Sequence, residues 1–183
     1  MASTSARSRD RDTARLVDAA IELFGARGPD AVSLREVAAA AGVNYGLIHQ
    51  YVGSKDELIR LAIRRVSTDA AARFSVDDVR STVERLVQHG PAPTSLRLLA
   101  WSLLMGRGAD DLVGRSLGLQ ALARRLDGEE TDARTAVVLA MSLLFGWQLF
   151  GDYLTESIGL DASTADRMIA SVRDEVERLL GAG

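Results

Sequence analysis

The 183-residue chain lacks cysteine, and it contains only three prolines, two histidines and 5% aromatic residues. Without cysteine there is neither a disulfide framework nor a thiolate metal site, which fits a cytoplasmic protein. The two histidines lie far apart in sequence, and no carboxylate cluster at ligand spacing or glycine-rich phosphate loop is present. The sequence therefore gives little support to an enzyme, and neither a cofactor nor a metal is expected.

The chain also lacks a large net charge, because its 22 basic and 25 acidic residues leave a net charge of −3. The first 60 residues balance eight basic against eight acidic side chains, so the remainder carries the whole negative excess. A neutral N-terminal part on an acidic body is compatible with DNA binding, and it predicts modest non-specific affinity with strong salt sensitivity. The first dozen residues are polar and show no secretory signal.

The chain has no apolar run of membrane-spanning length, although 47% of its residues are apolar. In the longest expected helix, 131–156, no charge appears over the 17 residues 135–151, which rise only about 26 Å as a helix. A bilayer span needs roughly 20 apolar residues, and this stretch also contains Ser142, Gln148 and two glycines. We therefore expect a buried helix there and no membrane partner.

What the sequence does contain is a strong local pattern around residue 33. Ser33 followed by Glu36 predicts a capping box, and so a helix start. Val32 and Val37 flank it at the spacing of a hydrophobic staple, which would fix how the chain enters the helix. Gly42, which can take a left-handed conformation, predicts the end of this helix.

A second short helix is expected directly afterwards, over residues 45–51, with Asn44 as its cap. Its inward residues would be Leu47 or Ile48, together with Tyr51. Only three residues separate the two helices, and a small Ala38 lets them approach closely. This spacing is typical of a helix-turn-helix, with an ordinary helical hairpin as the alternative.

A third capping pattern, Ser54 with Glu57, predicts a helix from Lys55 whose positive end lies beside the second short helix and suits a DNA phosphate. Together, FGARG, SLREVAAAAGV and NYGLIHQYVGSKDEL resemble the DNA-binding half of the tetracycline-repressor (TetR) family of bacterial transcription regulators. The resemblance covers about residues 12–62. The remaining two thirds resemble that family only in the number and order of helices.

The whole chain is expected to be all-α, with three helices in an N-terminal head and six in a body, as the resemblance implies. The head would span 12–54, supported by the start of the next helix, and an effector-binding and dimerisation domain would span 55–183. Residues 1–11 are expected to form a disordered tail, whose three arginines could alternatively follow DNA. The expected helices cover about 12–27, 33–42, 45–51, 55–74, 76–88, 94–106, 110–126, 131–156 and 164–180.

Geometry and family correspondence together give ten expected DNA contacts. Gln50 has an amide that can pair with adenine, and Leu47 could pack on a thymine methyl group. His49 stands where the family most often has tyrosine, so a phosphate contact is expected there, with its strength in question. Arg35 could reach a guanine or a phosphate. The other members are Tyr45 and Gly46, expected at base edges, and Ser33, Asn44, Tyr51 and Lys55, expected at the backbone, where Ser33 and Asn44 could instead serve only as caps.

A homodimer is expected, because one short helix in a groove buries little surface and specific sites generally need two heads about one DNA turn apart. The resemblance implies that the last two helices pair with those of a second copy as a four-helix bundle. About half of the interface candidates could instead belong to the core of one subunit. The candidates are Ala136, Leu139, Ala140, Leu143, Gly146, Trp147, Met168, Val172, Val176 and Leu179.

A cavity for a small hydrophobic or aromatic effector is likewise implied by the resemblance, although core packing is an alternative for each proposed lining residue. The expected function is a homodimeric, sequence-specific transcriptional repressor in the cytoplasm, released by that ligand from a palindromic operator in the nucleoid. The alternative is a DNA-binding regulator without an effector, controlled by a protein partner or by abundance. The lining candidates are Phe74, Trp101, Leu104, Met105, Leu119, Phe145 and Gln148.

Overall fold

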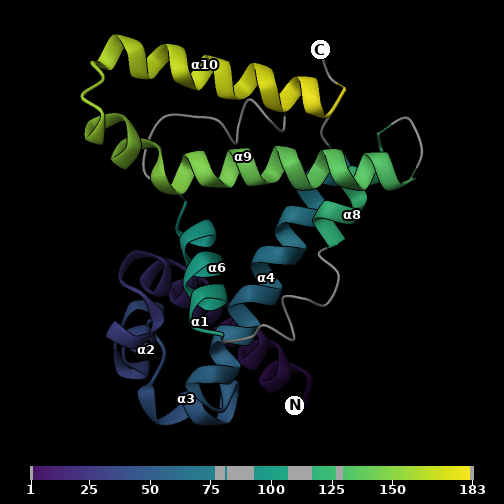
Figure 1. Cartoon of the computed structure of the whole chain (residues 1–183). Coiled ribbons are helices and arrows are strands. Elements are labelled where there is room, and N and C mark those ends of the chain that lie inside the picture. Colours follow the sequence, from purple (N-terminus) through teal and green to yellow (C-terminus); the bar gives the residue numbers. More distant parts are fainter. Residues whose placement is uncertain (1, 77–80, 82–92, 107–116, 127–129, 182–183) are drawn as a thin grey trace. The chain divides into compact units, whose positions relative to one another are not determined.

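The computed structural model describes residues 2–76, 81, 93–106, 117–126 and 130–181 (Figure 1). Within these ranges the chain forms eight α-helices and one short 3-10 turn, with no strand. The prediction of an all-α fold is therefore confirmed. The helix expected over 76–88 falls almost entirely outside the described residues.

The chain divides into two compact units. The boundary between them lies after Ser67, whereas the sequence placed it before Lys55. The first unit takes in 1–67 and 93–114, and the second takes in 68–92 and 115–183. Helix α4 (Lys55–Val76) therefore contributes its first thirteen residues to the first unit. Helix α6 (Thr94–Leu104) also belongs to that unit, because it packs against the first helix and buries Leu98 in the same core.

Helix α1 runs over Ala2–Arg27, ten residues more than the expected helix, so the structure differs from the expected disordered tail. Helix propagation is inexpensive once a nucleus exists, and the added segment contains alanine and arginine, which are good helix formers. Arg9 also makes a tertiary hydrogen bond to the backbone of Gln50. Sequence periodicity alone carries no signal for such a contact.

The core of the first unit lies between α1, α2 (Leu34–Ala41), α3 (Tyr45–Val52) and α4, with the 3-10 turn η1 (Pro29–Ala31) joining α1 to α2. The buried residues of α3 are Ile48 and Val52, and Leu47 is exposed, which resolves the choice between Leu47 and Ile48 left open by the sequence. Val32 and Val37 are both buried, as the staple requires. The fully buried members of this core include Leu16, Ala20, Phe24, Val37, Ile48, Leu58 and Ala62.

Helix α6 is held on α1 at three points. A Cβ at Gly25 would lie 2.1 Å from the Thr94 carbonyl oxygen, so the two backbones touch where α6 begins. The Thr94 hydroxyl donates to Glu22 at 3.0 Å. One turn beyond Gly25, Gly28 has φ 82° and faces the Trp101 ring, which a Cβ would approach to 3.3 Å. Two glycines therefore make room for α6.

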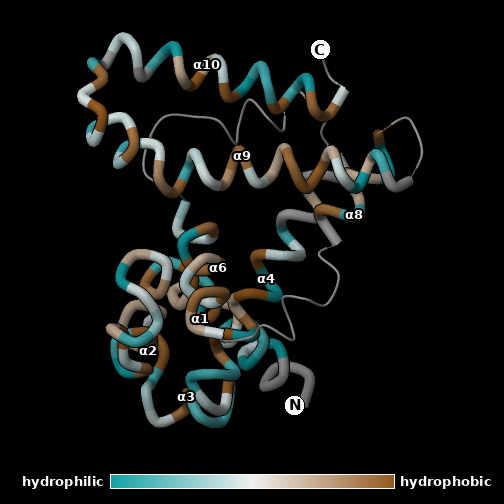
Figure 2. Tube along the Cα trace, viewed as in Figure 1, coloured by the Kyte–Doolittle hydropathy of each residue, from teal (hydrophilic) through white to brown (hydrophobic). Residues whose placement is uncertain are grey.

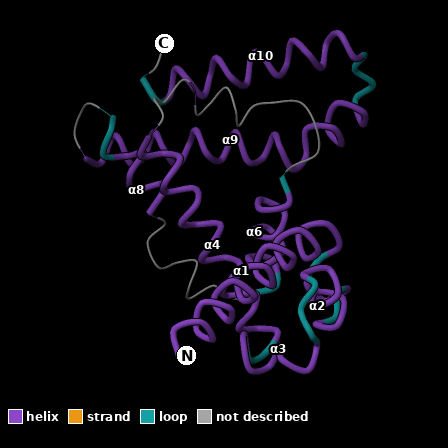
Figure 3. The backbone as a smooth tube through the Cα atoms, turned by 180° about the vertical axis from the view of Figure 1, so that it is seen from behind, coloured by secondary structure: helices purple, strands orange, loops and turns teal. Residues whose placement is uncertain are grey.

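The second unit contains α8 (Leu117–Ala123), α9 (Glu130–Ser157) and α10 (Ala162–Leu179). Helices α9 and α10 run antiparallel and side by side in both Figure 1 and Figure 3, and they pack against each other. Asp161 caps α10 by accepting a hydrogen bond from the Thr164 backbone N–H at 2.8 Å, so α10 begins two residues before the expected start. The core residues are Leu122 of α8, Val137, Ala140, Met141 and Leu144 of α9, and Val172, Val176 and Leu180 at α10.

The middle of α9 is largely hydrophobic and its two ends carry hydrophilic residues, whereas α10 alternates between hydrophilic and hydrophobic positions along its length (Figure 2). Over Asp132–Ser157, α9 is long and apolar enough to cross a bilayer by length and composition alone. Within its 18-residue apolar segment, 28% is buried. One face packs on α8 and α10. The apolar residues of its other face include Leu139 and Phe150, which are exposed.

Candidate nucleic-acid interface

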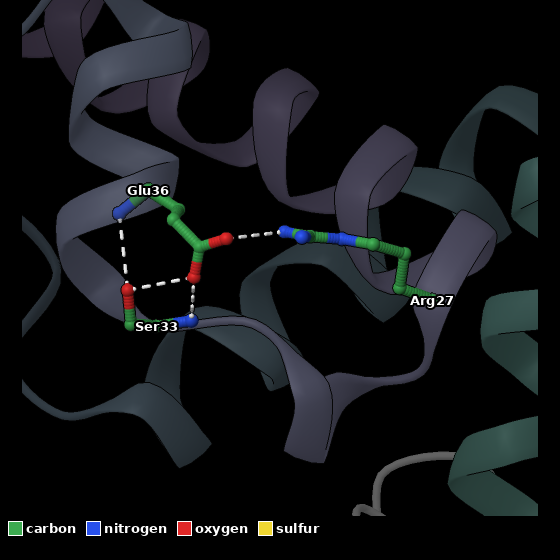
Figure 4. Close-up of polar contacts among 3 residues, drawn as sticks. All are labelled: Arg27, Ser33 and Glu36. Atoms are coloured by element: carbon green, nitrogen blue, oxygen red, sulfur yellow. Dashed lines mark hydrogen bonds and ion pairs between the residues drawn. The ribbon is translucent and has the colours of Figure 1, made fainter.

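The first helix of the motif begins at the predicted capping box (Figure 4). The Glu36 backbone N–H donates to Ser33 Oγ at 3.2 Å, and the Ser33 backbone N–H donates to Glu36 Oε2 at 2.8 Å. Arg27, at the end of α1, adds a 2.7 Å ion pair to the other carboxylate oxygen. These donors, the Ser33 backbone first and the Arg27 side chain next, lower the pKa of Glu36 from 4.5 to about 2. The entry to α2 is thus tied to the end of α1.

The turn between the two helices depends on Gly42, which has φ 63° and ψ 34°. Its N–H donates to Ala39 O at 3.1 Å, and the Val43 N–H reaches back to Ala38 O at 2.9 Å, closing the end of α2 as expected for a left-handed C-cap. A Cβ at Gly42 would also lie 2.7 Å from Nη2 of Arg15. A cation from α1 therefore lies at the negative end of α2.

Helix α3 starts at Asn44, whose side-chain oxygen accepts the Gly46 N–H at 2.8 Å. A Cβ at Gly46 would come within 3.3 Å of that oxygen, so a residue without a side chain suits the position. Leu47 is 38% exposed, whereas Ile48 is fully buried. The helix thus turns one apolar side chain outward, where it is free to meet a partner.

The expected DNA contacts Arg35, Tyr45 and His49 lie together on the outer surface of α2 and α3. The Arg35 guanidinium carbon is 5.2 Å from the centre of the Tyr45 ring, a cation–π geometry. The rings of Tyr45 and His49 meet edge to face, with centroids 6.3 Å apart. His49 Nδ1 donates to the Gly53 carbonyl at 2.8 Å, so in a neutral ring Nε2 is an acceptor rather than a donor.

The third cap is formed only in part. The Glu57 N–H donates to Ser54 Oγ at 3.1 Å, but among the described residues the Glu57 carboxylate does not return to the Ser54 backbone. It pairs instead with Arg60 and with Arg64, the latter at 3.2 Å. Arg60 first, then Arg64, lowers the pKa of Glu57. Two guanidinium groups therefore outcompete one backbone N–H, and Lys55 still begins α4.

Comparisons with known proteins agree with this geometry. Residues 16–62 match the family model described as bacterial regulatory proteins, tetR family. An HTH-type transcriptional repressor of Mycobacterium tuberculosis is 35% identical over 177 residues, covering 94% of this chain and 90% of the relative. The chain belongs to the TetR family. It is a DNA-binding transcription regulator.

The chain is also similar to a second curated repressor and to two solved structures. An HTH-type transcriptional repressor of Streptomyces coelicolor is 31% identical and covers 77% of each chain. A solved TetR-family structure from Mesorhizobium loti has a TM-score of 0.53 at 17% identity, covering 94% of this chain and 96% of that one. A second, from Streptomyces coelicolor, has a TM-score of 0.50 at 23% identity, covering 93% and 98%. The two structures support the TetR fold.

The TetR-type motif presents the ten expected DNA contacts unequally. Eight of them are exposed, and Tyr51 and Lys55 are half-buried. Ser33 uses its hydroxyl twice, accepting from the Glu36 N–H and donating to the Glu36 carboxylate at 2.8 Å. Asn44 uses its side-chain oxygen on Gly46. The alternative that these two serve as caps therefore has direct support.

The expected lining residues of a TetR-type effector cavity divide between the two units. Trp101, Leu104 and Met105 belong to the first, where Trp101 faces Gly28 and all three are exposed. Leu119 and Phe145 each pack against the core of the second unit, and Gln148 is half-buried on α9. The side chain of Phe74 lies outside the described part of the structure.

The expected dimer contacts also separate into two groups. Ala140, Val172 and Val176 are buried between α9 and α10 of a single chain. They belong to the core of one subunit, which is the alternative that the sequence left open for about half of the candidates. Leu179 packs against the same core and is half-buried. Ala136, Leu139, Leu143, Gly146 and Trp147 of α9, and Met168 of α10, are exposed or half-buried.

Two arginines hold the TetR motif through contacts that the sequence did not predict. Arg27 binds Glu36, and Arg9 donates to the Gln50 carbonyl at 2.6 Å. The pair Arg9 and Gln50 is separated by 41 positions, and no spacing rule of one helix relates them. The Arg27 contact had a local signal, since it lies in the last turn of α1, where a cation is favourable.

Proposed function

We propose that this TetR-family chain acts as a cytoplasmic homodimer that represses transcription from a palindromic operator in the nucleoid and is released by a small hydrophobic or aromatic ligand. The observation that carries the dimer is an apolar stripe on α9, defined by Leu139, Leu143, Gly146, Phe150 and Tyr153 at helical spacing. Phe150 is 56% exposed and Tyr153 is 68% exposed. Leu143, at the edge of this α9 stripe, also packs against the core shared with α10, whereas Leu139, Phe150 and Tyr153 are exposed.

A second copy is the partner that this stripe suits. Contiguous apolar patches of this kind on a soluble protein usually mark an interaction surface, and a twofold contact places the same patch of two copies against each other. A dimer also supplies the two heads that a specific DNA site requires, about 34 Å apart along the duplex. The α9 stripe and the recognition helix α3 are therefore both explained by a dimer with twofold symmetry.

The dimer is tested by placing charge on the α9 stripe. Replacing Phe150 and Tyr153 together by Glu should give a monomer in sedimentation equilibrium, because an interface core does not tolerate unpaired carboxylates. The control is Val138→Glu, also an exposed apolar residue of α9, which lies about 120° around the helix from Phe150. A wild-type chain that stays monomeric when concentrated would refute the dimer.

Base reading is assigned to the outward side of α3. Gln50 would pair with adenine and Leu47 would pack on a thymine methyl group, and both side chains are exposed. Gln50→Ala and Leu47→Ala should each change sequence preference in selection from random duplexes. The wild type should enrich an inverted repeat with half-site centres about 10–10.5 base pairs apart. Selection that enriches no inverted repeat would contradict the operator proposal.

Release by a ligand has its support in α6. This helix leaves apolar side chains uncovered, with Leu104 80% exposed, and it is bound to α1 through Thr94 and through Trp101 on Gly28. A hydrophobic ligand that binds α6 would act on α1 and so on the motif. A thousandfold loss of operator affinity needs about 4 kcal/mol of differential binding.

Two tryptophans allow this release to be followed. In a Trp147→Phe variant, Trp101 is the remaining tryptophan, so its fluorescence reports on α6 while hydrophobic and aromatic compounds are titrated. A true effector should change that emission and lower operator affinity in the same concentration range. A regulator without an effector would show neither change across the compound set.

A further inference from the structure

The first two turns of α1 lie beside the end of α3, in front and rear views alike (Figures 1 and 3). Their contact is made by Arg9, whose Nη2 donates to the Gln50 carbonyl at 2.6 Å. The same guanidinium lies 5.9 Å from the centre of the Tyr51 ring. A residue well upstream of the segment matched by the family model, 16–62, thus binds the recognition helix.

The Gln50 carbonyl belongs to the last turn of α3, where carbonyl groups have no intrahelical donor. A cation there satisfies the acceptor and complements the negative end of the helix dipole. Helix α3 has only eight residues, which is too short to be stable without contacts to its surroundings. Its position therefore depends on the packing of Ile48 and Val52 in the core and on the groups that bind its ends, of which Arg9 is one.

We infer that Arg9 is a positioning residue for base reading, which acts through the backbone of Gln50 and fixes where the Gln50 amide meets a base. The inference rests on the proposed role of Gln50. A bidentate contact to a base needs close alignment of both hydrogen bonds, and functional groups generally have to be held within about 0.5 Å. Arg9 holds the main chain of the reading residue by its carbonyl oxygen.

Arg11 provides a matched control. It is an exposed arginine two positions along α1, and the helical angle of about 200° between them places it on the opposite side of the helix from Arg9. Arg9→Ala and Arg11→Ala remove the same charge from the same helix. If charge alone mattered, the two variants would behave alike.

The experiment measures operator binding against a duplex mismatched at the base read by Gln50, across a range of salt concentrations. Arg9→Ala should lower this discrimination by roughly tenfold, within the range of about 5- to 150-fold that a base contact supplies. Its salt slope should stay within about half a unit of the wild type, because a lost phosphate contact would flatten it by about 0.9. Arg11→Ala should keep the discrimination, and Arg9→Lys, which retains a cationic donor, should recover part of it.

A double-mutant cycle separates this inference from the proposal on which it rests. In a Gln50→Ala background, Arg9→Ala should have almost no further effect on discrimination, since residues that act as one unit are not additive. If Gln50→Ala itself leaves discrimination unchanged, the role of Gln50 fails. If Gln50→Ala reduces it but Arg9→Ala does not, or if Arg9→Ala and Arg11→Ala flatten the salt slope equally, the positioning role of Arg9 is overturned while that of Gln50 stands.

Discussion

The sharpest test of the first unit is Gly25→Ala. In a helix interior, replacing glycine by alanine normally stabilises by about 0.5–1 kcal/mol. Here the new Cβ would stand 2.1 Å from the Thr94 carbonyl oxygen, a backbone atom that cannot rotate away. To reach an ordinary contact of 3.4 Å, the start of α6 has to retreat by 1.3 Å, the difference between these two distances.

That retreat acts on packed groups. It strains the 3.0 Å hydrogen bond from Thr94 to Glu22 and disturbs Leu98, which is buried in the core of the first unit. Overpacking of this kind costs about 1–3 kcal/mol. After the gain in helix propensity, we expect a net destabilisation of about 1–2 kcal/mol, or a fall in melting temperature of about 2–8 °C for a chain of this size.

The assay is thermal unfolding followed by circular dichroism, with Ala26→Gly as the matched control. Ala26 is the exposed neighbour of Gly25, so this exchange measures propensity alone and should cost up to about 1 kcal/mol. Both variants should therefore melt below the wild type. If Gly25→Ala melts above the wild type, α6 does not touch α1 at this point and the reasoning is refuted.

Four further outcomes follow from the motif. Ser33→Ala should cost about 1 kcal/mol of stability by removing the α2 cap, measured by denaturant unfolding. The pKa of Glu36 is lowered from 4.5 to about 2, so its contribution is complete above pH 4.5 and is lost as the pH falls towards 2; Glu36→Gln should lack this acid-dependent loss in pH melts. Gly42→Ala should destabilise by about 1 kcal/mol or more, because φ is 63° there, and unchanged melting would contradict it. Lys55→Ala should weaken all duplexes alike and flatten the salt slope by about one in binding titrations.

The helix-turn-helix could be predicted because its signals are local. The capping box of Ser33 with Glu36, the left-handed Gly42 and the Asn44 cap all involve residues within a few positions of one another. Such contacts are formed inside one turn of chain, and residue type and spacing are enough to identify them. The sequence left the inward side of α3 open, and burial of Ile48 decided it.

Contacts between distant segments could not be predicted in this way. The expected disordered tail forms the start of α1, which Arg9 binds to α3. The Glu57 carboxylate, expected to complete a second capping box, pairs with arginines one and two turns further along α4. Each of these outcomes depends on which of several possible partners a side chain binds, and the pattern within one segment does not reveal that choice.

By itself, the sequence determined an all-helical chain with a TetR-type DNA-binding motif, since helix caps, glycine turns and apolar periodicity are properties of neighbouring residues. Only the tertiary structure decided that α6 joins the unit of the motif, because that depends on the missing Cβ of Gly25 meeting the backbone of Thr94. It also decided which apolar residues of α9 and α10 are buried in the core of one chain. Burial is a property of what packs against a helix face, and two apolar faces of one helix look alike until one of them is covered.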